Sequence, residues 1–599
     1  MKKIIIFLIL LLLIPTVNAQ RGNMKLLAVS ETNNGYKGGV ADLFLEIKPG
    51  SGRVFLETFP LTKVDTQIST RFAKEIACDF AEADCEKFDF FYTITAGSSI
   101  IAGPSAGAAI SVLTFSLIKD IDYDKNIAIT GTINSGGLIG PVGGIKAKIE
   151  AADRIGLKKV LIPLGELIAA ETITGNDAAN KSTNPSINES FDLEEIRKEL
   201  DMDIIEVSTL DEAIFEFTGK RFRQKKADLT ISPDYKDTMK MLAIQLCSRS
   251  TKLKNKISDF PAAGNRTEQI QKNAFNLSEK GKDSFNDGTY YSAASYCFGA
   301  NVEFNYLDLL AQNLTEKEIT EKVQELKEEI KNFDTEIGNR GIKTITDLES
   351  YMVVKERLIE ANDFLNLALE TITNKNTSLH NLAYSIERIN SAESWSKFLS
   401  NTGKKFDLNS EVIKNTCKTK LSEVEERLQY VQLYFPQNLA NTRKELEYAY
   451  LDLEENNYEL CLFKASKAKA NVDTILSVFG VSTDNINSII DQKLNIVERN
   501  LVEETEKGIF PILGYSYFEY ANSLKNSDPF SALLYSGYAL ELSNLDIYFK
   551  SYNGNINFPE IDKKLFVVLI SGIILGIIIA NIARISKKTT KRKPKRINK

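Results

Sequence analysis

The chain has 599 residues, and its 80 acidic side chains outnumber its 74 basic ones, which gives a net charge of −6. Because residues 584–599 are strongly basic, the rest of the chain is more acidic still, and this charge disfavours nucleic acid as a partner. The only histidine, His380, lies far downstream in a region of helical patterns, which disfavours a histidine-based hydrolytic site.

Residues 1–19 have the pattern of a secretory signal peptide. Two lysines precede an apolar run from Ile4 to Ile14, and Val17-Asn18-Ala19 is a small-residue cleavage site. An uncleaved anchor is the alternative, but the apolar run is short for a membrane span and is stopped by Pro15.

Residues 24–221 show mixed helix and strand patterns, and 176–190 within them predict a polar surface insertion before a helix over 193–200. Residues 43–47 and 53–58 alternate in hydrophobicity around Pro49-Gly50-Ser51-Gly52, which predicts a β-hairpin. Hydrophobic spacing predicts the remaining elements in this order: helix 67–80, strand 88–94, helix 107–118, strand 127–130, helix 145–155 and strand 160–163.

After a linker at 222–233, residues 234–555 predict an all-helical region of long helices with few glycines. Three segments each begin with a turn and continue with an aromatic residue and small residues at helical spacing, which is typical of helical-hairpin repeats: 288–300, 457–468 and 528–539. Their unequal separation leaves two alternatives, a plain antiparallel bundle or a tetratricopeptide-like array.

Residues 565–583 are almost wholly apolar and long enough to cross a bilayer as one helix. A buried core helix is the alternative, but charged residues precede the run, and the basic tail 584–599 contains no acid. By the positive-inside rule this tail would lie in the cytoplasm. With a cleaved signal, the sequence predicts a single-pass protein of the cell membrane whose α/β and helical regions lie outside the cell.

The six cysteines predict three disulfides, because their number is even and the expected compartment is oxidising. The pairing of neighbours gives Cys78–Cys85, Cys247–Cys297 and Cys417–Cys461. The first pair requires a helix end near Cys78, since one continuous helix would separate its cysteines too far. No CxxC pattern is present, so no metal site is expected. Sequons make candidate glycosylation sites of Asn180, Asn188, Asn265, Asn276, Asn313 and Asn376.

The most specific chemistry lies in two glycine-rich segments. Gly103-Pro-Ser105-Ala106-Gly107 places a serine at a tight turn, where the amides of a helix start could stabilise an oxyanion. Gly140-Pro-Val-Gly-Gly-Ile-Lys146-Ala-Lys148 places two lysines after a second turn. A neutral lysine can take the proton of a serine when burial lowers the lysine pKa. Together the two segments predict a Ser–Lys hydrolase.

With Gly38-Gly39, Thr130-Gly131 and 151–163, these segments resemble the proteolytic domain of the Lon proteases in their order and in the interval from Ser105 to Lys148. The resemblance implies an α+β protease domain in which Ser105 attacks the peptide carbonyl and Lys148 is the general base. Thr130 would position the lysine, and Gly103 and Ala106 would support the serine turn. Lys146 is the competing base, and the family pattern favours Lys148.

The chain departs from the Lon pattern at several positions. Ala102 stands where Lon proteases commonly carry an acid, and Tyr92 and Thr93 lie near where some members have histidines. No Gly-x4-Gly-Lys-Ser/Thr phosphate loop occurs, so the ATP-driven unfoldase of Lon is not expected, and neither is a cofactor. The overall plan resembles archaeal membrane-anchored Lon-like proteases.

The resemblance therefore implies a membrane-anchored, ATP-independent serine endopeptidase that cleaves unfolded or flexible polypeptides outside the cell. Two alternatives remain: a catalytically silent Lon-like scaffold for binding or assembly, which Ala102 favours, and a protease whose main substrate is its own chain. The helical region would be a receptor or gate for substrates, or a simple stalk. A homo-oligomer is expected by analogy with Lon rings.

Overall fold

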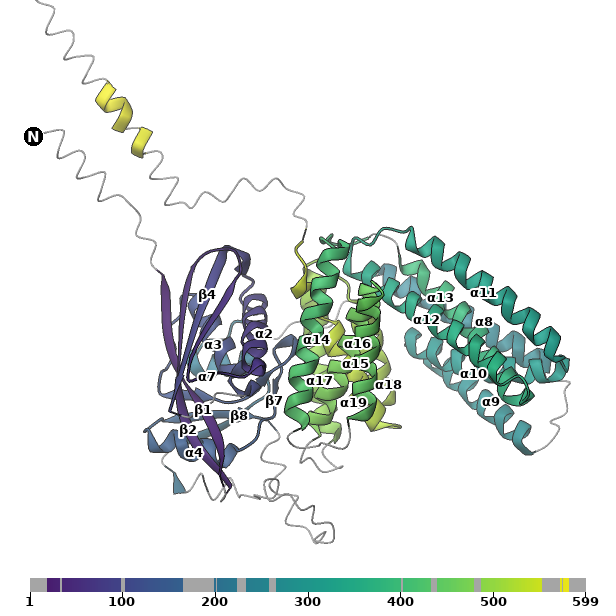
Figure 1. Ribbon diagram of the computed structural model, residues 1–599, viewed down its shortest axis with the longest axis horizontal. Helices are drawn as coiled ribbons and strands as arrows, with labels where there is room; N and C mark the ends of the chain where they lie inside the picture. Colours follow the sequence, from purple (N-terminus) through teal and green to yellow (C-terminus); the bar gives the residue numbers. More distant parts are fainter. Residues whose placement is uncertain are drawn as a thin grey trace, which may run out of the picture. The chain divides into compact units, whose positions relative to one another are not determined.

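The computed structural model describes residues 19–32, 35–97, 103–164, 196, 199–200, 202–223, 233–257, 265–399, 402–432, 439–478, 486–551, 571–573 and 575–580. Residues Gln20–Ser551 form one compact unit, and every contact discussed below lies within it. In sequence order this unit contains a mixed α/β part followed by a long helical region (Figure 1).

A mixed β-sheet forms the centre of the α/β part (Figure 1). Its strands β1 and β2 are a long antiparallel pair, whereas β5, β8 and β9 continue the sheet from β1 as parallel neighbours. A separate short pair, β6 (Thr132–Ile133) and β7 (Ile139–Gly140), follows β5 in the chain. Across the sheet the order is β3 (Val54–Phe59), β4 (Phe88–Ala96), β2 (Gly35–Pro49), β1 (Gln20–Thr32), β5 (Ile127–Ile129), β8 (Lys159–Pro163) and β9 (Asp203–Val207).

Two hydrophobic cores cover the two faces of this sheet. The first contains side chains of α2 (Val64–Phe80), α3 (Gly107–Ile118) and α7 (Leu210–Thr218), and the second those of α4 (Ile145–Arg154). Neighbouring Leu26 and Leu27 of β1 belong to different cores, as the two-residue period of a strand requires. Helix α3 is mostly apolar and is buried on all sides from Gly107 to Leu117.

The predicted hairpin of residues 43–47 with 53–58 is wrong, because β2 and β3 do not pair. Strand β4 lies between them, antiparallel to β2 and parallel to β3. The carboxylate of Asp89, on β4, accepts hydrogen bonds from the amides of Ser51 and Arg53 in the connection, at 2.8 and 3.0 Å. The connection therefore folds around the start of β4 and leaves space for that strand.

The helical region packs neighbouring helices against each other, among them α9 with α10, α15 with α16 and α18 with α19. The three similar segments of the sequence each begin the second helix of one of these pairs, and their alanines are buried. The helices are α8 (Pro233–Ile257), α9 (Asn265–Asn286), α10 (Tyr290–Gln312), α11 (Glu316–Gly338), α12 (Ile345–Glu370), α13 (Lys375–Trp395), α14 (Ser410–Gln432), α15 (Ala440–Glu454), α16 (Tyr458–Ser477), α17 (Ile486–Glu506), α18 (Ile512–Leu524) and α19 (Pro529–Leu542).

The prediction of a C-terminal transmembrane helix, and with it of a single-pass location in the cell membrane, is corrected by the structure. Among the described residues no helix is both long and apolar enough to cross a bilayer. Within 565–583, the helical residues that are described are 571–573 and 575–580.

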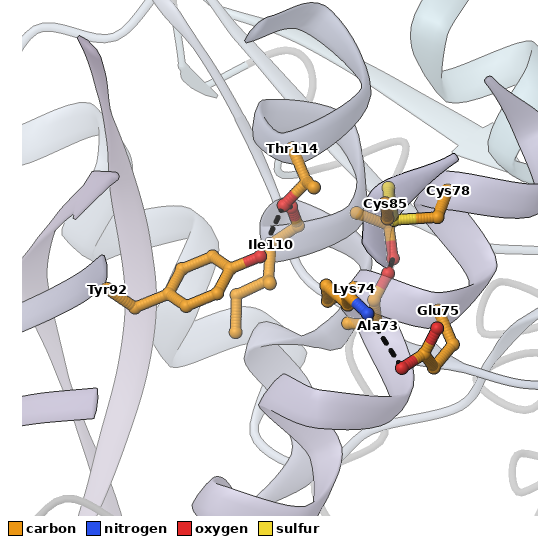
Figure 2. Close-up of a disulfide and its surroundings, with 9 residues drawn as sticks. Ala73, Lys74, Glu75, Cys78, Cys85, Tyr92, Ile110 and Thr114 are labelled. Atoms are coloured by element: carbon orange, nitrogen blue, oxygen red, sulfur yellow. Dashed lines mark hydrogen bonds and ion pairs between the residues drawn. A yellow bond between two sulfur atoms is a disulfide. The ribbon is translucent and has the colours of Figure 1, made fainter. Parts of the chain in front are cut away.

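The structure contains the three disulfides that the sequence predicts. Cys78 and Cys85 have Cα atoms 6.0 Å apart, and α2 ends at Phe80, which lets the chain turn back between them (Figure 2). The Cα atoms of Cys247 and Cys297 are 5.1 Å apart, and the disulfide joins α8 to α10. Cys417 and Cys461 join α14 to α16 with a Cα separation of 5.8 Å. Every cysteine of the chain is therefore paired.

Several sequence predictions fall outside the described residues. Of the six sequons, Asn265, Asn276, Asn313 and Asn376 are described and exposed, so glycosylation there stays a prediction. Outside the described residues lie the signal peptide up to residue 18, Ala102, the insertion 176–190 with Asn180 and Asn188, most of the helix 193–200, most of the linker 222–233 and the basic tail 584–599.

Candidate active site

Ser105 lies in a tight turn that leads directly into the buried helix α3. Gly103 begins this turn with a φ of 95°, a conformation that glycine adopts without the strain other residues would have. Pro104–Ala106 form a single 3-10 turn, and the ring of Pro104 restricts φ at its first position. Ser105 itself is half-buried. The sequence thus builds a rigid turn that holds a serine hydroxyl next to the start of a helix.

Thr130 and Gly131, directly after β5, hold the serine turn in place. The Gly131 amide donates a hydrogen bond to the Ser105 carbonyl oxygen at 3.1 Å, and the Ala108 amide donates to the Gly131 carbonyl oxygen at 3.1 Å. A side chain at position 131 would not fit, since a Cβ there would lie 2.5 Å from Cγ2 of Ile139. Two backbone hydrogen bonds therefore fix the serine turn to the end of β5.

Lys148 contacts the side chain of the same Thr130. Its Nζ donates to Thr130 Oγ1 at 3.0 Å, and the exposed fractions of the two side chains are 2% and 0%. Lys146 lies two residues earlier on α4 and is half-buried. Residues two apart on a helix do not share a face, so only one of these lysines can turn toward Thr130. The lysine that does so is Lys148.

The structure thus joins the predicted site residues through one dipeptide. Lys148 is bonded to the side chain of Thr130, and Ser105 is bonded to the backbone of the adjacent Gly131. Gly103 and Ala106 flank the serine in the same turn. The arrangement thus attaches the backbone of Ser105 and the buried amine of Lys148 to one short segment, Thr130-Gly131.

Asp65 adds a carboxylate that the sequence analysis missed. It lies in the first turn of α2, where Oδ1 accepts the Thr66 amide at 2.6 Å and Oδ2 accepts the Gly103 amide at 3.0 Å. Lon proteases commonly carry an acid at the position of Ala102, and here an acid from another element binds the next residue. The only sequence signal for Asp65 is an acid in the first turn of the predicted helix, which is common for capping reasons alone.

Tyr92, which lies near where some Lon proteases have histidine, belongs to the hydrophobic core. Its hydroxyl and Thr114 Oγ1 are 2.8 Å apart, and Thr114 Oγ1 donates onward to the Ile110 carbonyl oxygen at 2.7 Å (Figure 2). The tyrosine is therefore the donor in the first of these bonds. Burial raises the pKa of Tyr92 well above its ordinary value, which keeps the hydroxyl protonated. His380, on α13, packs its ring against Tyr306 in the helical region, with ring centroids 5.2 Å apart.

Known proteins are similar to the part of the chain that contains these residues. Residues 63–173 match the family model of the Lon protease (S16) C-terminal proteolytic domain. This part of the chain is similar to the proteolytic domain of the Lon proteases. The match begins just before Asp65 and includes Ser105, Thr130 and Lys148.

The same similarity appears in individual Lon proteases. The Lon protease of Methanosphaera stadtmanae is 31% identical over 199 residues, which are 32% of this chain and 21% of that protein. The Lon protease of Paraburkholderia phytofirmans is 36% identical over 128 residues, 20% of this chain and 16% of that protein. Lon protease 2 of Bacillus subtilis is 48% identical over 67 residues, 11% of this chain and 12% of that protein. The chain therefore spans about a fifth or less of the length of these relatives.

Proposed function

We propose that this protein is an ATP-independent serine endopeptidase in which Ser105 is the nucleophile and Lys148 the general base. The observation that carries the proposal is a pair of hydrogen bonds to the dipeptide Thr130-Gly131. Lys148 binds the side chain of Thr130, and the Ser105 turn binds the backbone of Gly131. Similarity to Lon proteases supports peptide-bond hydrolysis as the reaction.

In this mechanism the neutral amine of Lys148 takes the proton of Ser105 as Oγ attacks the peptide carbonyl carbon. This step needs the neutral amine, because only an amine without its extra proton can act as a base. The tetrahedral intermediate then collapses, the C–N bond breaks, and the lysine ammonium returns its proton to the leaving amine. Water hydrolyses the resulting Ser105 ester by the same route in reverse, with Lys148 first accepting and then donating a proton.

The first turn of α3 offers donors for the oxyanion that forms in the tetrahedral intermediate. The amide of Gly107 is bonded to Pro104, and that of Ala108 to Gly131. The amides of Ser105 and Ala106, which precede the regular helix bonds, are the candidates for an oxyanion hole. Gly103 allows a substrate backbone to approach this turn closely, because it carries no side chain.

The expected substrates are unfolded chains and flexible loops or termini. The sequence contains no Gly-x4-Gly-Lys-Ser/Thr phosphate loop, so we expect no ATP-driven unfolding of folded substrates. The three disulfides favour an oxidising compartment as the place of action. Self-association by analogy with Lon rings stays a prediction.

Substitution of the two residues tests the mechanism. Ser105→Ala and Lys148→Ala should each abolish cleavage of unfolded casein and labelling of the protein by a fluorophosphonate, which modifies activated serines. Lys146→Ala is the matched control, and we expect it to keep most of both activities. The rate should rise with pH as the general base loses its proton.

Full activity of either Ser105→Ala or Lys148→Ala would contradict the mechanism. A folded wild-type protein that neither cleaves casein nor reacts with the fluorophosphonate would instead favour the catalytically silent scaffold. Cleavage of its own chain alone, with no cleavage of casein, would favour the self-processing alternative.

A further inference from the structure

Helix α14 of the helical region contacts both chain segments that hold the Ser–Lys site. Arg427 Nη2 donates to the carbonyl oxygen of Ile133 and to Oδ1 of Asn134, both at 2.7 Å. The hydroxyl oxygen of Tyr430 accepts the amide of Gly143 at 3.0 Å. Arg427 and Tyr430 are three residues apart, so they lie on the same face of the helix. One helix face therefore reaches the segment after Thr130 and the segment before Lys148.

Arg427 acts on the segment that continues from Thr130-Gly131. Ile133, whose carbonyl it binds, lies in β6, two residues after Gly131. Ile133 also packs closely on the start of α3, since a Cβ on Gly107 would lie 3.1 Å from its backbone nitrogen. With so little free space, a shift of Ile133 would move the serine turn and Thr130 together.

Tyr430 acts on the turn from which α4 starts. Gly143 precedes Gly144, which has a φ of 68° and whose carbonyl oxygen accepts the Lys148 amide at 3.0 Å. The bond from Gly143 to Tyr430 therefore helps to orient the first turn of α4. Because Lys148 lies at the end of that turn, the direction of its side chain toward Thr130 depends on how α4 begins.

Both side chains are built into a buried interface rather than lying on a surface. The exposed fractions of Arg427 and Tyr430 are 2% and 8%. The Arg427 guanidinium lies 3.5 Å from Glu426 and 3.3 Å from Asp473. Burial of such a charged group gives little net stability, and its better-attested benefit is a specific geometry. Here the geometry that it specifies is that of the segment after Thr130.

We propose that Arg427 and Tyr430 are positioning residues that the helical region supplies to the Ser–Lys site. The inference rests on the proposed function, since it concerns the reactivity of Ser105. The helical region is then neither only a stalk nor only a gate for substrates. It is part of the structure that aligns the catalytic serine and lysine, and the α/β part reaches full activity only with α14 in place.

Removal of one hydroxyl group tests the role of Tyr430 in the full chain. Tyr430→Phe should lower kcat for an unstructured peptide and the rate of fluorophosphonate labelling by roughly tenfold, as expected for a small misplacement of catalytic groups, with KM nearly unchanged. Tyr450→Phe is the matched control, because the Tyr450 hydroxyl binds Glu425 within the helical region. Equal labelling rates of the two variants would overturn the role of Tyr430.

A second pair of variants tests Arg427 without loss of charge. Arg427→Lys keeps the cation, but its side chain is shorter and lacks the planar guanidinium whose Nη2 binds both oxygen acceptors. It should therefore slow labelling at least as much as Tyr430→Phe. Arg443→Lys, at an exposed position of α15, is the control. If Arg427→Lys unfolds at the same temperature as the wild type, a slower labelling rate is not caused by loss of the fold. An unchanged labelling rate would overturn the role of Arg427. Ser105→Ala separates the two proposals. Labelling that survives in this variant contradicts the Ser–Lys mechanism. Labelling that is lost in Ser105→Ala but keeps the wild-type rate in Tyr430→Phe and Arg427→Lys contradicts positioning by α14.

Discussion

Asp65 links two features that are far apart in sequence, the start of α2 and the serine turn. Its two carboxylate oxygens accept different backbone amides, those of Thr66 and Gly103. An amide side chain has only one acceptor oxygen, so Asp65→Asn can keep one of these bonds but not both. The carboxylate is therefore suited to fasten the serine turn to α2 while it also binds an amide in the first turn of that helix.

We predict that Asp65→Asn lowers the rate of fluorophosphonate labelling of Ser105 by about fivefold, because one hydrogen bond of about 1 kcal/mol to the serine turn is lost. The measurement is the labelling rate of the folded protein at a fixed reagent concentration. Asp124→Asn is the matched control, since the carboxylate of Asp124 also accepts a backbone amide, that of Asn126, in an exposed turn. A variant as fast as this control would show that the link between Asp65 and Gly103 has no effect on the serine.

At the scale of an element, α14 carries charged side chains on its buried face. Glu426 is 3% exposed, and its neighbours include Arg427 on the same helix, Asp473 and Lys469 on α16, and Asp65 on α2. Burial is the largest cause that raises the pKa of Glu426 to about 7, and Asp473 and Asp65 add to this, whereas Arg427 and Lys469 oppose it. The folded protein thus keeps a proton on Glu426 at pH values where the unfolded chain has released it.

This difference in pKa predicts how stability depends on pH. Because the folded-state pKa is above the ordinary value of 4.5, the free energy of unfolding should fall as the pH rises from 4.5 through about 7. Glu426→Gln lacks this proton, so between about pH 5 and about pH 8 it should lose less stability than the wild type, by up to ~3 kcal/mol. Urea unfolding at the two pH values measures the difference, with Glu425→Gln, on the less buried side of α14, as control. Parallel pH dependence of wild type and Glu426→Gln would contradict a protonated Glu426.

Helices and strands differ in how well the sequence predicted them. The helix over 107–118 is found at these bounds, and that over 145–155 ends one residue earlier, because each pattern directly reports the face or the whole surface that is buried. A strand pattern reports which face is buried but not which strand lies alongside. Here β2 pairs with β4 rather than β3, and the connection between β2 and β3 is bound by Asp89, which lies later in the chain on β4.

The site shows the same limit. Ser105, Thr130 and Lys148 could be named from the sequence because they occur in short glycine-rich motifs of known order. Arg427 and Tyr430 could not, since they are ordinary polar positions of a long helix and contact the site only through the packing of α14. Short motifs thus predicted the residues expected to do the chemistry, whereas the residues that support them are brought there by tertiary contacts.

At the scale of the whole unit Gln20–Ser551, a buried ionic cluster joins the α/β part to the helical region. Lys469 on α16 lies 3.0 Å from Glu541 on α19, 3.5 Å from Oγ of Ser135 and 4.2 Å from the centre of the Phe72 ring on α2. Its side chain is 1% exposed, so loss of its charge would leave Glu541 buried with only part of its compensation. The hydrophobic core of the helical region also extends to Leu138 of the α/β part.

These contacts predict that the α/β part and the helical region unfold together. Trp395, the only tryptophan, is buried in the helical region and reports on it by fluorescence, whereas fluorophosphonate labelling of Ser105 reports on the α/β part. On heating, both signals should be lost at one temperature, and Lys469→Met should lower that temperature for both, since breaking a buried ion pair costs roughly 3–5 kcal/mol. Lys464→Met is the control, because Lys464 pairs with Asp452 inside the helical region and is more exposed. Two outcomes would contradict joint unfolding: labelling that disappears at a much lower temperature than the fluorescence change, or a Lys469→Met variant in which only one signal shifts. Either would mean that the two parts are stable independently and that α14 does not have to stay docked for the serine to react.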